Sequence, residues 1–75
     1  MVDIEKLKRI IKDSGISVSF IAEKAGMSRG TLYTRFDGYD DFRASEIEGI
    51  TKALKLSKDE RDSIFFADDV ELKSS

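Results

Sequence analysis

The chain contains no cysteine, histidine, proline or tryptophan among its 75 residues. Without cysteine there are no disulfides. Without both cysteine and histidine, the usual ligands of a structural zinc site and the usual nucleophile and general base of hydrolytic enzymes are missing. We therefore expect no enzymatic activity, no metal and no cofactor. No apolar run approaches the roughly 20 residues of a membrane span, and residues 1–10 lack the apolar core of a secretory signal. The expectation is a cytoplasmic protein.

The length and the distribution of charge add two further constraints. Seventy-five residues make one small domain, which without disulfides or a metal depends on compact helical packing. The net charge of −2 is divided unevenly. Residues 1–36 carry seven basic and four acidic side chains, whereas residues 37–75 carry six basic and eleven acidic ones. Such asymmetry is typical of a protein that presents one face to phosphates and keeps another away from them.

The spacing of apolar residues predicts an all-helical domain of four or five short helices. Ile4, Leu7 and Ile11 recur at helical intervals and predict the first helix over residues 3–13. The remaining predicted helices cover residues 17–25, the stretch between Ser28 and Gly38, residues 44–54, and a last helix that begins with the capping box from Ser57 to Glu60. Residues 2–66 are thus predicted to form an all-α bundle, followed by an acidic, loosely ordered tail over residues 67–75.

The second and third predicted helices are joined by a tight turn. Gly26 stands where the end of a helix requires a left-handed backbone, and Met27 supplies an apolar residue for the turn. Ser28 caps the next helix, on which Leu32 and Phe36 share one face. Two short helices joined in this way predict a helix-turn-helix, the arrangement of many DNA-binding proteins.

The same stretch resembles the helix-turn-helix of the phage lambda repressor and Cro family, also called the XRE family. The resemblance rests on Ala22, on Gly26 four residues later and on Leu32 six further, with the turn AEKAGMS and the ending RFDG. It implies a compact bundle of five short helices with the helix-turn-helix at helices two and three. It also implies the function of a small phage or mobile-element repressor. Arg35 departs from the pattern, because many members place an apolar core residue there, and Phe36 takes over that packing role one position later.

Apolar residues at helical spacing are interpreted as core residues that hold the helices at a fixed angle. In the helix pair these are Ile21, Ala25, Met27, Leu32 and Phe36. The first, fourth and fifth helices add Ile10, Ile47, Ile50, Leu54, Ile64 and Phe65, and the loop before the fourth helix is anchored by Tyr39 and Phe42.

The candidates for base contact lie at the start of the third helix, because that end of a helix-turn-helix reader lies nearest the bases. They are Ser28, Arg29, Gly30, Thr31 and Tyr33. Arg29 is the strongest candidate, since a guanidinium donates two hydrogen bonds to the edge of guanine. For Tyr33, contact with a base and contact with a phosphate both remain open. The chain has no Asn or Gln to read adenine, so a preference for A·T must come from thymine methyl groups, hydroxyls or DNA shape.

Phosphate contacts are expected from polar groups that flank the groove. The candidates are Ser17, Ser19, Thr34, Arg35, Tyr39 and Arg43. For each of them, and for Arg29, the alternative is an ordinary solvated surface residue.

These features predict a sequence-specific DNA-binding transcriptional regulator that binds double-stranded DNA and no small-molecule ligand. A homodimer through the last helix and the tail would match two half-sites of a palindrome. The apolar residues that would form this dimer surface are Phe65, Phe66, Val70 and Leu72. The alternative is a protein-interaction module on the same fold that does not bind DNA, which the acidity of the chain and Asp37, Asp40 and Asp41 favour.

Overall fold

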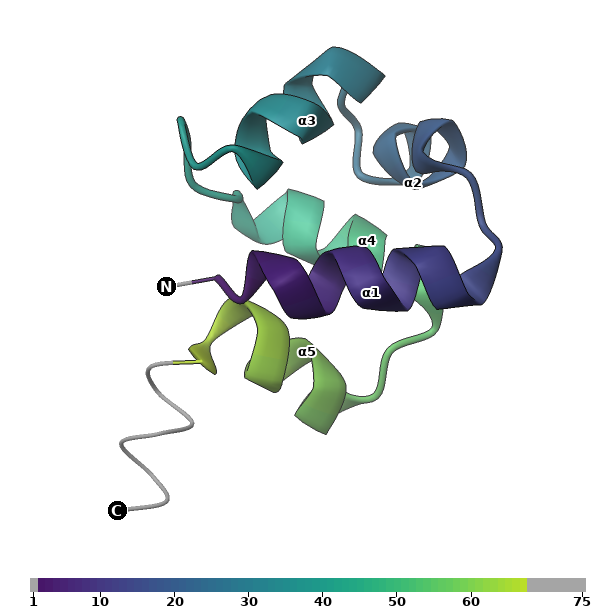
Figure 1. Ribbon diagram of the computed structural model, residues 1–75, viewed down its shortest axis with the longest axis vertical. Helices are drawn as coiled ribbons and strands as arrows, with labels where there is room; N and C mark the ends of the chain where they lie inside the picture. Colours follow the sequence, from purple (N-terminus) through teal and green to yellow (C-terminus); the bar gives the residue numbers. More distant parts are fainter. Residues whose placement is uncertain (1, 68–75) are drawn as a thin grey trace.

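The computed structural model describes residues 2–67, which form five helices and no strand (Figure 1). The helices are α1 (Ile4–Ser14), α2 (Val18–Lys24), α3 (Arg29–Phe36), α4 (Ala44–Leu54) and α5 (Lys58–Phe65). The number, order and approximate bounds predicted from the sequence are confirmed, and α4 has the bounds that were predicted. The predicted tail lies outside the described residues except for Ala67, and so do Val70 and Leu72 of the predicted dimer surface.

Side-chain caps explain where four of the helices begin. Asp3, Ser17 and Ser28 each accept a hydrogen bond from the backbone amide three residues later, at 3.1 Å in all three cases. At the start of α5, the Ser57 hydroxyl accepts from the Glu60 amide at 3.1 Å, and the Glu60 carboxylate accepts from the Ser57 amide at 2.9 Å. Each cap satisfies amides that have no partner within their own helix. The predicted serine caps and the capping box are confirmed.

The turn between α2 and α3 depends on the left-handed conformation of Gly26. Its φ is +75°, and its amide donates to the Glu23 carbonyl at 3.1 Å. The next amide, of Met27, donates to the Ala22 carbonyl at 3.0 Å. This pair of bonds is a Schellman motif, which closes a helix and redirects the chain. The glycine predicted to end the first helix of the pair therefore does so.

Lys55 ends α4 in the same left-handed conformation, with a φ of 54°, but without the freedom of a glycine. A side chain with a Cβ is strained by about 1–2 kcal/mol there. We expect Lys55→Gly to raise the free energy of unfolding by up to about 1 kcal/mol, because part of that strain is offset by the greater freedom of glycine in the unfolded chain. Urea denaturation measures the effect. Lys52→Gly, one turn earlier and within the helix, is the control and is expected to lose about 1 kcal/mol. A loss of stability in Lys55→Gly would contradict the prediction.

All five helices contribute to one apolar core. Its buried members are Leu7 and Ile11 from α1, Ile21 and Ala22 from α2 with Ala25 just after it, Leu32 and Phe36 from α3, Ile50 from α4, and Ile64 and Phe65 from α5. The predicted core residues are confirmed as buried or as packed against this cluster, Met27 among the latter. Phe42 anchors its loop as predicted, because its ring packs edge to face on Phe65 with centroids 5.3 Å apart. Tyr39 does not: its side chain is 80% exposed, so that prediction was wrong.

Figure 1 shows α2 and α3 together at one end of the molecule, α5 at the opposite end, and α1 and α4 between them. α5 is tied to α1, since the Asp3 amide donates to the Ile64 carbonyl at 2.7 Å and the Lys6 ammonium donates to the Ser63 hydroxyl at 2.7 Å. α2 packs mainly against α4. Within residues 2–67, no helix combines the length and apolar character that crossing a membrane requires.

Candidate nucleic-acid interface

The two faces of α3 differ in their exposure. Leu32 and Phe36 point into the core, whereas Arg29, Gly30 and Tyr33 are exposed. The exposed residues gather at the amino end of the helix and continue from its exposed cap, Ser28, with Thr31 half-buried beside them. The five residues predicted to contact bases therefore lie together on the first two turns of α3.

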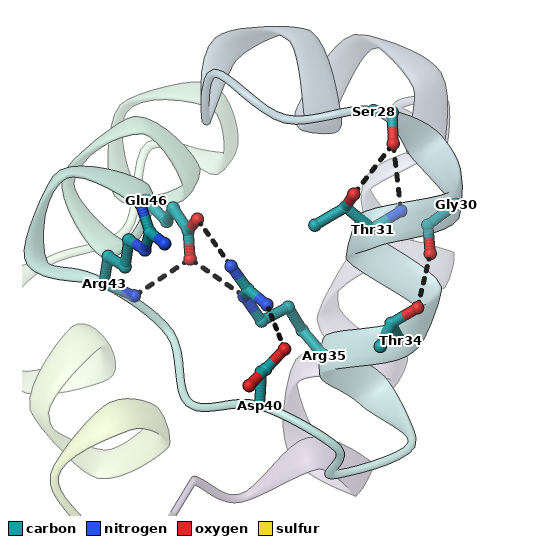
Figure 2. A network of polar contacts seen from close by, with 8 residues as sticks. All are labelled: Ser28, Gly30, Thr31, Thr34, Arg35, Asp40, Arg43 and Glu46. Carbon is teal, nitrogen blue, oxygen red and sulfur yellow. Dashed lines mark hydrogen bonds and ion pairs between the residues drawn. The ribbon is translucent and has the colours of Figure 1, made fainter.

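Ser28 and Thr31 form a local unit at the start of the helix (Figure 2). The Ser28 hydroxyl accepts from the Thr31 amide at 3.1 Å and donates to the Thr31 hydroxyl oxygen at 2.9 Å. Each hydroxyl has one donor and two acceptor positions, so the proton of the Thr31 hydroxyl is left to donate elsewhere. Ser28 serves mainly as the cap, and Thr31 is the better placed of the two to donate to a ligand.

Arg29 is placed over its neighbour one turn later. The guanidinium carbon lies 5.6 Å from the centre of the Tyr33 ring, and Arg29 Nη2 lies 3.5 Å from the Tyr33 hydroxyl oxygen. The ring in turn packs edge to face on Phe36, with centroids 5.9 Å apart. A cation over an aromatic face is worth about 0.5–1 kcal/mol at an exposed site. Arg29 is thus partly preorganised on a ring that the core holds in place.

Arg35 has a role that the sequence reading did not predict. Its side chain is buried, with 8% of its surface exposed, and it pairs with Glu46 of α4 (Figure 2). Arg35 Nε donates to Glu46 Oε1 at 3.1 Å and Nη2 donates to Oε2 at 3.0 Å. A guanidinium held by both oxygens of a carboxylate is not open to a phosphate. The prediction of a phosphate contact at Arg35 is therefore corrected: the residue is an internal tie between α3 and α4.

The pair is ionised at neutral pH. Hydrogen bonding to Glu46 raises the pKa of Arg35, although burial opposes this. The pKa of Glu46 is lowered from its ordinary value of 4.5, chiefly by the Arg35 hydrogen bond and also by the backbone amide of Arg43, while burial acts in the opposite direction. The same guanidinium reaches Asp40, whose Oδ2 lies 3.3 Å from Arg35 Nη1. Asp37, Asp40 and Asp41 follow α3, and their negative charges would repel a nearby phosphate. The contact with Arg35 offsets the charge of Asp40.

The other predicted phosphate contacts differ in how free they are. The Thr34 hydroxyl donates to the Gly30 carbonyl at 3.0 Å, so its proton is engaged within the chain. The exposed Ser17 hydroxyl accepts from the Phe20 amide as the cap of α2, and its proton is left to donate elsewhere. Ser19, Tyr39 and Arg43 are exposed. Ser19 lies in the first turn of α2, and the other two lie beyond the carboxyl end of α3. These three, together with Ser17, are the candidates that the structure leaves open to a ligand.

Glu46 and Gly49 matter to this surface, and neither was singled out from the sequence. Glu46 does have a sequence signal, because an acid three residues into a helix is the second half of a capping box. Its carboxylate accepts from the Arg43 amide at 2.9 Å. Gly49 has no such signal, since its closeness to α2 depends on how the helices cross. A Cβ built on Gly49 would collide with the Lys24 carbonyl oxygen and lie 2.7 Å from the Ala25 Cα.

Residues 2–67 contain no cluster of three acidic side chains arranged to hold a metal ion. Comparison with protein-family models, with curated proteins and with solved structures finds no match.

Proposed function

We propose that this chain is a sequence-specific DNA-binding transcriptional regulator. In this proposal α2 and α3 are a helix-turn-helix of the lambda repressor type, and α3 enters the major groove. The observation that carries it is the division of α3: Leu32 and Phe36 are buried, while Arg29, Gly30 and Tyr33 are exposed at the amino end. That end of the second helix is the part that meets base edges in such proteins. As a binding protein of this class, the chain needs no catalytic group and no cofactor.

Gly30 supports the proposal because the fold gives no reason for a glycine there. A Cβ at this position would meet only the Ser28 hydroxyl oxygen, 3.9 Å away, which is an ordinary contact. A glycine within a helix costs about 0.5–1 kcal/mol relative to alanine. The position is exposed, so a surface requirement accounts for it: without a side chain, the backbone of α3 approaches a ligand more closely.

The proposal takes its phosphate contacts from exposed polar groups on both sides of α3. Ser19 lies at the amino end of α2, and Tyr39 and Arg43 follow α3. Contacts of this kind set the register of a protein on the duplex, and base contacts then provide the specificity. The basic excess of residues 1–36 favours the same end of the chain for DNA.

A homodimer is part of the proposal, with a surface narrower than the sequence indicated. Phe65 is buried in the core and only 4% exposed, so the proposed dimer surface does not include it. Phe66 is 39% exposed and lines a groove between α4 and α5 together with Phe42 and Ile47. The residues that line this groove come from α4, α5 and their flanking segments and not from α3, so a dimer formed there would leave two α3 helices free for two half-sites.

The same groove is the observation that favours the alternative, a protein-interaction module that does not bind DNA. An exposed apolar groove is typical of a partner site. In that case the acidic half of the chain would discourage contact with nucleic acid. The two functions predict different surfaces, so one titration separates them.

The test is an amide-shift titration of isotope-labelled protein with a mixed-sequence DNA duplex at low salt, repeated at higher salt. We expect shifts at Ser17, at Ser19 and from Ser28 to Arg43 that decline steeply with salt, because phosphate contacts release counterions. Amides of α1, which contributes no residue to the proposed dimer groove, are the internal reference and are expected to stay in place at DNA concentrations that saturate the others. Absence of any shift around α3 would reject DNA binding and leave the interaction module.

Gly30→Ala separates stability from binding. We expect the variant to gain about 0.5–1 kcal/mol in urea denaturation, because alanine is the better helix former and finds space. We expect its affinity for the duplex to fall at least about fivefold, since the added methyl overfills a close contact between helix and groove. A fall in affinity in a more stable protein cannot come from unfolding. Unchanged affinity would show that α3 does not approach DNA at this position.

A further inference from the structure

The Glu46 carboxylate of α4 forms hydrogen bonds with Arg35 in the last turn of α3, the proposed reading helix. The bidentate pair of Arg35 and Glu46 is the buried polar contact between α3 and α4, and Figure 2 shows the arginine reaching from the last turn of α3 to the first turn of α4. The residues on either side of Arg35 in the core, Leu32 and Phe36, are apolar. The buried face of α3 thus carries one charged guanidinium between apolar side chains.

Glu46 holds two segments at once. Its Oε1 accepts from Arg35 Nε at 3.1 Å and from the Arg43 amide at 2.9 Å, and its Oε2 accepts from Arg35 Nη2 at 3.0 Å. One side chain therefore joins the last turn of α3 to the residue that starts α4. Asp40, 3.3 Å from Arg35 Nη1, brings the intervening loop to the same guanidinium.

Net stabilisation is a weak explanation for this pair. Removing two charges from water costs about as much as their attraction returns, so an apolar pair of similar volume is often as stable or more so. The ion pair differs from an apolar pair in fixing an orientation. Two parallel hydrogen bonds between planar groups allow one relative orientation of the two side chains, whereas methyl and methylene contacts tolerate rotation. α3 spans only eight residues, which leaves few other contacts to set its orientation.

We propose that Glu46 is a positioning residue for α3. Acting through Arg35, it sets the orientation at which α3 presents Arg29 and Tyr33 to DNA, and so determines specificity without touching the ligand. The inference rests on the proposed function for its DNA readout, but its effect on α3 exists in the free protein.

The test replaces the ion pair with an apolar one. Glu46→Leu alone leaves the buried arginine with only the exposed Asp40 as a partner and is expected to melt well below the wild type. The double variant Arg35→Met/Glu46→Leu removes both charges and is expected to recover most of that loss, to within about 8 °C of the wild type. Amide hydrogen exchange then reports the order of α3, with α1 as the reference. We expect α3 amides to exchange at least about fivefold faster in the double variant after correction for global stability, and α1 amides to be unchanged.

The second readout is the ratio of affinities for a duplex selected from a random library and for mixed-sequence duplex. We expect this ratio to fall at least about fivefold in the double variant, because a misdirected helix loses base contacts while phosphate contacts persist. A double variant that keeps both the ratio and the α3 protection of the wild type would overturn the proposal. If the wild type binds no duplex, the proposed function fails, while hydrogen exchange still tests the positioning.

Glu46→Gln carries the test if the double variant does not fold. With its amide oxygen in the place of Oε1, glutamine keeps the bonds from Arg35 Nε and the Arg43 amide and loses the one from Nη2. Relative to the wild type, we expect about a twofold fall in the affinity ratio. We also expect the exchange of α3 amides to accelerate more than that of α1 amides. A glutamine variant that matches the wild type in both would overturn the proposal as well.

Discussion

Arg29→Ala is expected to abolish the preference for G·C at one position of the selected DNA site. Two hydrogen bonds from a guanidinium to guanine discriminate by about 1–3 kcal/mol, so the ratio of affinities for G·C and A·T at that position should fall about 5- to 150-fold. Arg29 is the candidate for this contact because it is exposed at the start of α3 and already lies over the Tyr33 ring, 5.6 Å from its centre. Binding assays with single base-pair replacements across the selected site measure the change.

Two other variants separate base reading from charge. Arg43→Ala is expected to weaken all duplexes alike and to reduce the slope of log affinity against log salt by about one. Lys58→Ala removes one exposed charge at the start of α5, at the opposite end of the molecule from α3, and is expected to change neither quantity measurably. If Arg29→Ala and Arg43→Ala lowered affinity equally for every sequence, Arg29 would be a phosphate contact and not a base reader.

Gly49→Ala is expected to destabilise the whole domain. The new methyl would lie 2.7 Å from the Ala25 Cα and closer still to the Lys24 carbonyl oxygen, and backbone atoms cannot rotate away as a side chain can. Overfilling of this kind costs about 1–3 kcal/mol or more, which exceeds the roughly 1 kcal/mol that alanine gains as a helix former. A domain of this size has only about 3–5 kcal/mol of stability from its core, so urea denaturation should show a large shift of the midpoint.

Gly30→Ala is the matched control, because it makes the same substitution in a helix where the space is open. The two variants are expected to shift stability in opposite directions. Equal effects would show that helix propensity alone decides both, and that α2 and α4 do not approach as closely at Gly49 as the structure indicates. α2 holds α3 through the Gly26 turn, so a forced separation of α2 from α4 would also displace the proposed reading helix.

The polar residues of the candidate surface were predictable to different degrees. Ser28 and Arg29 were found because a cap and the residues after it can be read from local sequence. Arg35 was misassigned to the surface, although its position three residues after Leu32 places it on the buried side of a helix with 3.6 residues per turn. An arginine there has a place only because Glu46, eleven residues later, meets it. No local pattern identifies that partner.

Tyr39 is the opposite case, a residue that was predicted to pack and is exposed. An aromatic residue in a polar loop is expected to pack, and Phe42 does so on Phe65. Tyr39 is 80% exposed. Which of two aromatic residues in one loop turns inward depends on the path of the chain from α3 to α4, and the ties from Arg35 to Asp40 and Glu46 help to set that path.

Local sequence patterns were enough to predict the order and starting points of the helices, the left-handed turn at Gly26 and most of the core. These features depend on caps, on glycine conformation and on apolar spacing, all of which act within a few residues. Helix packing, in contrast, determined that Arg35 is an internal tie to Glu46, that the end of α2 leaves no room for a Cβ at Gly49, and that Tyr39 faces outward. Those outcomes depend on groups that are distant in the chain and meet only when the helices are packed. The interactions between such groups cannot be predicted from a short stretch of sequence.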